Sequence, residues 1–146
     1  MSYRSLVLGG LAATLLAGMA HADETITIDD PYFRMARPGA PTGGVFMVIE
    51  NHGDSDDRLV SASSGIARMV QLHTHQIDAN GVAKMTEVEG GFAVPAHGEH
   101  ALERGGDHVM VMGITAPVEE GTMVPLTLVF EKAGEIHLEV PVDSSR

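Results

Sequence analysis

The sequence predicts an all-β protein, either a β-sandwich or a β-barrel. Short apolar runs recur along the chain and are separated by clusters of Gly, Pro, Asn and Asp. We find no segment longer than about ten residues with the apolar periodicity of a helix. Several short strands at such spacing, bounded by turn residues, are typical of sandwiches and barrels.

Seven segments have the composition of strands, because they alternate or are continuously apolar over five or six residues. They are residues 24–28, 45–49, 68–72, 84–88, 108–112, 126–130 and 135–140. Asn80 and Gly81 lie between the third and fourth of these segments. An Asn-Gly pair between two strands favours a tight hairpin turn, so we expect these two strands to pair.

The first 22 residues have the layout of a secretory signal sequence. Arg4 is followed by an almost wholly apolar stretch at 6–17, and Ala20 and Ala22 form a small-x-small cleavage motif. The stretch is shorter than the about 20 apolar residues of a membrane span, although an uncleaved anchor is an alternative. We therefore expect export to the periplasm, cleavage after Ala22, and one domain over 23–146. With no Cys in the chain, a lipid anchor is not expected.

The net charge and the cysteine count exclude several classes of function. The formal net charge is −11, which argues against nucleic-acid binding, because phosphate recognition needs clustered Lys and Arg. The absence of Cys excludes thiol–disulfide exchange, thiolate zinc clusters and blue-copper sites. No nucleophile elbow or spaced catalytic triad is present, so we expect a protein that is not an enzyme.

The chain contains nine Met and eight His, whose side chains can bind metal ions. The first candidate pair of ligands is His108 and Met110. Side chains two apart in a strand share a face, with Cα atoms about 7 Å apart, so the imidazole and the thioether could converge on one ion. Met112 shares that face and is either a third sulfur ligand or a core residue.

His73 and Met85 could join this pair. A hairpin through Asn80 and Gly81 would bring the Met85 strand back toward the His73 strand, and the His108 strand could pack close by. Thioether sulfur binds hard ions poorly, whereas Cu(I) accepts both thioether and imidazole. The structural alternative is that these Met side chains fill the core and that the His side chains lie at the surface.

The segment 73–113 resembles the PCuAC family of periplasmic copper chaperones. That family carries a His, a Met about a dozen residues later, and a distant His-x-Met, which correspond here to His73, Met85, His108 and Met110. The segment 28–51 is similar to the usual opening of the family. Between Met85 and His108 lie 22 residues, one more than the family pattern.

The resemblance implies a cupredoxin-like or immunoglobulin-like β-barrel or sandwich. It implies one Cu(I) ion bound near the surface by two His and two Met. It also implies delivery of copper toward the CuA centre of cytochrome c oxidase, directly or through a Sco-type partner.

The remaining histidines are weaker candidates. His75 could be an auxiliary ligand, for example for Cu(II) at a secondary site, but we interpret it as a solvated loop residue. His97 and His100 fall in a segment that is typical of a turn. His52, between Asn51 and Gly53, is also in a turn context, and we expect His137 to face outward from the last strand. Two other functions remain open, namely a copper-dependent electron-transfer protein and a β-sandwich interaction domain that binds no metal.

Overall fold

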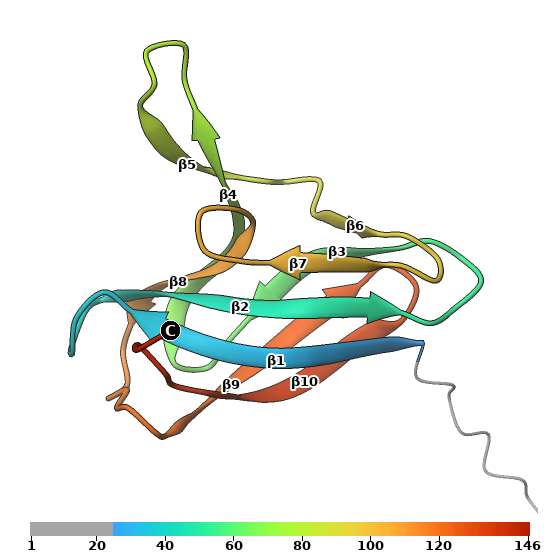
Figure 1. Ribbon diagram of the computed structural model, residues 1–146. Coiled ribbons are helices and arrows are strands. Elements are labelled where there is room, and N and C mark those ends of the chain that lie inside the picture. The colour runs from blue at the N-terminus through green and yellow to red at the C-terminus, as the bar shows by residue number, and fades with distance from the viewer. Residues whose placement is uncertain (1–24) are drawn as a thin grey trace, which may run out of the picture.

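The computed structural model describes residues 25–146. The expected signal sequence and its cleavage site lie outside the described residues. The described chain forms two antiparallel sheets, stacked face to face (Figure 1). This confirms the predicted all-β fold and shows that, of the two predicted architectures, it is the sandwich. None of the described residues forms a helix long and apolar enough to cross a membrane.

The larger sheet has the strand order β1-β2-β8-β4-β5, with β7 paired to β2. Its strands are β1 (Ile26–Met35), β2 (Thr42–Asn51), β4 (Ala67–Ile77), β5 (Ala83–Glu87), β7 (Glu99–Leu102) and β8 (His108–Ile114). The β4–β5 hairpin extends beyond the rest of this sheet at one end of the molecule (Figure 1).

The smaller sheet has the order β10-β9-β3-β6. Its strands are β3 (Asp57–Ser63), β6 (Phe92–Val94), β9 (Met123–Phe130) and β10 (Gly134–Pro141). Every one of the seven predicted strands overlaps an observed one, but β3, β6 and β7 were not predicted. β6 and β7 are only 3 and 4 residues long, too short to show a periodicity. His100 lies in β7, so its assignment to a turn was wrong.

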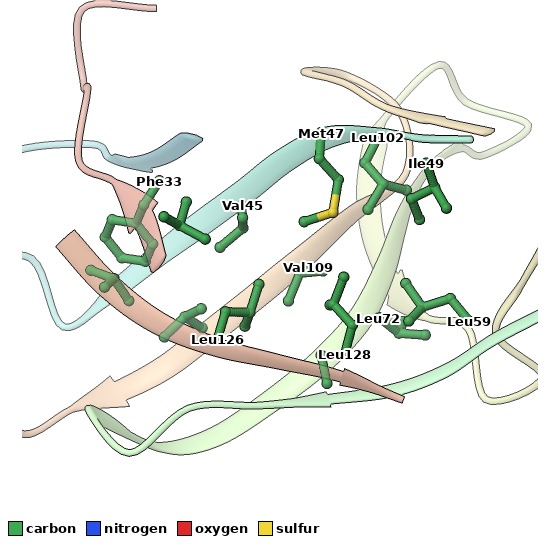
Figure 2. Close-up of a cluster of buried hydrophobic side chains, with 14 of the residues drawn as sticks. Phe33, Val45, Met47, Ile49, Leu59, Leu72, Leu102, Val109, Leu126 and Leu128 are labelled. Carbon is green, nitrogen blue, oxygen red and sulfur yellow. The ribbon is translucent and has the colours of Figure 1, made fainter. Parts of the chain in front are cut away.

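The core lies between the two sheets and is built from alternate residues of each strand. Leu72 of β4 and Val109 of β8 are register partners and both point inward, where Leu126 and Leu128 of the other sheet also lie (Figure 2). Val109 and Val111 are fully buried. Because strand side chains alternate between faces, His108 and Met110 are directed to the outer face of the larger sheet.

The start of β3 is fixed by the buried carboxylate of Asp57. Its Oδ1 accepts hydrogen bonds from the backbone N–H groups of Arg58 (2.7 Å) and Lys132 (2.9 Å). Its Oδ2 accepts one from Ala133 (3.0 Å). One side chain thus satisfies three amides and joins β3 to the turn between β9 and β10.

Replacing Asp57 with Ala should lower the free energy of unfolding by about 2 kcal/mol or more. The substitution removes a carboxylate acceptor and leaves the three backbone N–H groups that donate to it without that partner. Asp29→Ala is the matched control, since Asp29 is an exposed strand residue, and it should change stability by less than about 0.5 kcal/mol. Urea unfolding measures both. Equal effects of the two substitutions would contradict this account.

Candidate metal centre

The register of three strands gathers His and Met side chains on the outer face of the larger sheet. His73 of β4 lies directly opposite His108 of β8, and Gln71 lies opposite Met110. On the other side of β4, His75 lies opposite Met85 of β5. Direct partners in antiparallel strands share a face, so the four predicted residues and His75 all project from the same face.

The predicted hairpin through Asn80 and Gly81 is confirmed. The backbone carbonyl of Asp78 accepts a hydrogen bond from the N–H of Gly81 (3.0 Å). The backbone N–H of Asp78 donates to the carbonyl of Val82 (3.0 Å). The partner of His73 across this hairpin, however, is Glu87 and not Met85.

An open pocket of about 580 Å³ lies over this face. Met85, His108 and Met110 line it together with His75, whereas His73 is adjacent to His108 but is not part of the lining. The two thioethers that the sequence predicted to converge therefore share one pocket. Met112 is absent from the lining and pairs with Thr42 and Met69 farther along the sheet.

Gly44 keeps the floor of the pocket open. It is the β2 partner of Met110 and lies in the pocket lining. A Cβ atom at this position would come within 3.1 Å of the Phe46 ring and 4.0 Å of the His108 ring. A side chain here would occupy space beside both His108 and Met110.

His108 is the most deeply placed of these residues, with only 3% of its surface exposed. Its Nδ1 donates to the carbonyl of Gly106 (3.1 Å), because a carbonyl oxygen can only accept, and this leaves Nε2 with a free lone pair. Burial lowers the pKa of His108 below its ordinary value and outweighs the Gly106 hydrogen bond, which raises it. The ring is therefore held in the neutral form that can bind a metal ion.

In His73 the two ring nitrogens have the opposite roles to those in His108. Its Nε2 lies 2.9 Å from Oε1 of Gln71 and donates to it. Its Nδ1 is buried and finds no hydrogen-bond partner among the described residues. Burying a nitrogen lone pair that accepts no hydrogen bond costs free energy. Coordination of a metal cation would use this lone pair. The rings of His73 and His108 have centroids 5.9 Å apart.

His75 corrects the interpretation drawn from the sequence. It belongs to β4 and is half-buried, not a solvated loop residue. Its ring centroid lies 5.3 Å from that of His108. The signal was present in the sequence, because His73 and His75 are two apart on a strand, as are His108 and Met110.

The donors present restrict the metal. Within residues 25–146, no three His, Asp or Glu side chains are grouped closely enough to form a metal site by themselves. The soft donors that line this pocket are the thioethers of Met85 and Met110 and the imidazoles of His75 and His108. Mixed thioether and imidazole ligands suit Cu(I) far better than Mg²⁺ or Ca²⁺.

Several solved structures are similar to this chain. The copper-bound PCuAC domain from PmoF2 is 28% identical, with a TM-score of 0.67, and the match covers 82% of this chain and 93% of that domain. The solution structure of CuI-DR1885 from Deinococcus radiodurans is 27% identical, with a TM-score of 0.65, and covers 88% of this chain and 83% of that one.

A curated relative is a protein of Leifsonia xyli subsp. xyli (strain CTCB07) that carries the name "Putative lipoprotein Lxx21020". It is 35% identical over 104 residues, which are 71% of this chain and 62% of the relative. The chain thus matches less than two thirds of the length of that protein.

The family model described as "Putative lipoprotein LpqE-like" matches residues 26–142, which is nearly all of the sandwich. The resemblance to PCuAC domains inferred from the sequence is supported by the two similar structures. The chain therefore belongs to the LpqE-like family and has the fold of a PCuAC domain.

Proposed function

We propose that this protein is an exported copper carrier, without catalytic activity, that binds one Cu(I) ion and passes it to another protein. The observation that carries the proposal is the open pocket lined by Met85, His108 and Met110. The ring of His73 lies with its centroid 5.9 Å from that of His108, and its buried Nδ1 has no hydrogen-bond partner among residues 25–146. In this proposal His73, Met85, His108 and Met110 are the ligands.

The similar structures support this choice of metal, since one is a copper-bound PCuAC domain and another is CuI-DR1885. The name of the Leifsonia relative, a lipoprotein, supports export to the cell envelope, and the signal-like start of the chain favours the periplasm. Thioethers also suit such a compartment, because they cannot form disulfides.

The pocket is suited to transfer of the ion. Met85 is 48% exposed, so a ligand of a partner protein could reach the ion before the carrier's own ligands leave. Thioether and imidazole are neutral ligands, and they would release copper more readily than thiolates would. We propose the CuA centre of cytochrome c oxidase as the destination, reached directly or through a Sco-type protein.

Replacing Met110 or His108 with Ala should weaken Cu(I) binding by at least about tenfold, because each removes one donor from the pocket. Met123→Ala is the matched control, since Met123 is 59% exposed on β9 of the other sheet. Competition titration with a Cu(I) chelator measures all three affinities. Wild-type affinity in both pocket variants would refute the ligand assignment, and an intense, stable visible copper band would favour electron transfer instead.

Acidification from pH 7 to pH 5 should weaken Cu(I) binding, because protons compete for imidazole nitrogen, whose ordinary pKa is about 6.5. Burial lowers the pKa of His108, so protonation of this ring occurs only below that ordinary value. The same titration at pH 7, 6 and 5, with pH-corrected chelator constants, measures the effect. Constant affinity over this range would argue against imidazole ligands.

A further inference from the structure

His75 has the placement of a ligand, although the four-ligand proposal does not use it. It lies two residues after His73 on the outward face of β4 and directly opposite Met85 in the hairpin. It lines the same pocket as Met85, His108 and Met110.

The hydrogen bonds of His75 leave its outer nitrogen free. The carbonyl of Gly106 accepts from Nδ1 of His75 (3.3 Å) and also from Nδ1 of His108 (3.1 Å). A carbonyl oxygen has two lone pairs and no proton, so both Nδ1 atoms carry hydrogen and both Nε2 atoms have a lone pair. Histidines that bind metals commonly donate their other ring N–H to a backbone carbonyl in this way.

The spacing of the rings also fits a shared ion. With metal–nitrogen bonds of about 2.0 Å, two imidazoles on one ion have ring centroids roughly 4.5–6.3 Å apart, depending on the angle between the bonds. The observed separations from His108 are 5.3 Å for His75 and 5.9 Å for His73, and both fall in that range. The three rings do not form a ready-made cluster, so binding by all three requires side-chain rotation, for which the half-buried His75 faces an open pocket.

We infer that His75 is a further ligand of the metal in this pocket, through Nε2, and that the third imidazole allows the site to hold Cu(II) as well as Cu(I). Imidazole nitrogen suits Cu(II), whereas thioether sulfur selects Cu(I). The inference rests on the proposed function, because it takes the same pocket as the copper site.

The test compares the wild-type protein with His75→Gln and with His137→Gln, a control that removes an exposed histidine from β10. One equivalent of Cu(II) is titrated against a competing chelator, and the electron paramagnetic resonance spectrum is recorded. His75→Gln should lower Cu(II) affinity by at least about tenfold and change the spectrum, while Cu(I) affinity falls less. The control should match the wild type in all three measurements.

This inference would be overturned if His75→Gln had the Cu(II) affinity and spectrum of the wild type. The proposed function would remain intact in that case, provided that Cu(I) binding still depended on His108 and Met110. Absence of Cu(I) binding by the wild type would refute both. If His75→Gln fails to fold, pulsed electron paramagnetic resonance on the Cu(II)-loaded wild type decides by counting coordinated imidazoles. Three imidazoles support the inference, and two or fewer overturn it.

Discussion

The candidate site depends on one constraint, the antiparallel register of β4 with its two neighbours. Pairing with β8 places His73 opposite His108, and pairing with β5 places His75 opposite Met85. A slip of one residue in β8 would turn its histidine and methionine inward and its valines outward, because strand side chains alternate with a period of two. Burial of Val109 and Val111 in the core therefore fixes the orientation of the site residues on the same strand.

Much of this could be predicted from the sequence, for identifiable reasons. The Asn80-Gly81 turn has a strong conformational preference, so the pairing of the strands on either side followed from local chemistry. The alternation of residues in β8 is enough by itself to place His108 and Met110 on one face. The register of β4 and β5, in contrast, is not encoded locally. The sequence could therefore predict that His73 and Met85 share a face, but not that the direct partner of Met85 is His75.

Other features of the site depend on contacts that have no sequence signature. The shared acceptor of His75 and His108 is a backbone carbonyl, that of Gly106, and any residue could supply one. The open floor at Gly44 requires knowing that β2 lies beside β8 with Gly44 opposite Met110. The short strands β6 and β7 form through pairing with β3 and β2, so tertiary pairing and not local propensity decides them.

A carrier must both hold its cargo and release it, and the pocket residues divide between these demands by burial. His108 is nearly inaccessible and its ring donates to the carbonyl of Gly106. The neighbouring ring of His73 has a buried Nδ1 without a hydrogen-bond partner in the described part of the chain. Met85, in contrast, is half exposed on the hairpin that extends from the sheet (Figure 1). Ordered, buried ligands lose little conformational entropy on binding, whereas an exposed thioether loses more. In the proposed carrier, the imidazoles would therefore anchor the ion, and the hairpin methionine would be the ligand that an incoming partner most easily replaces.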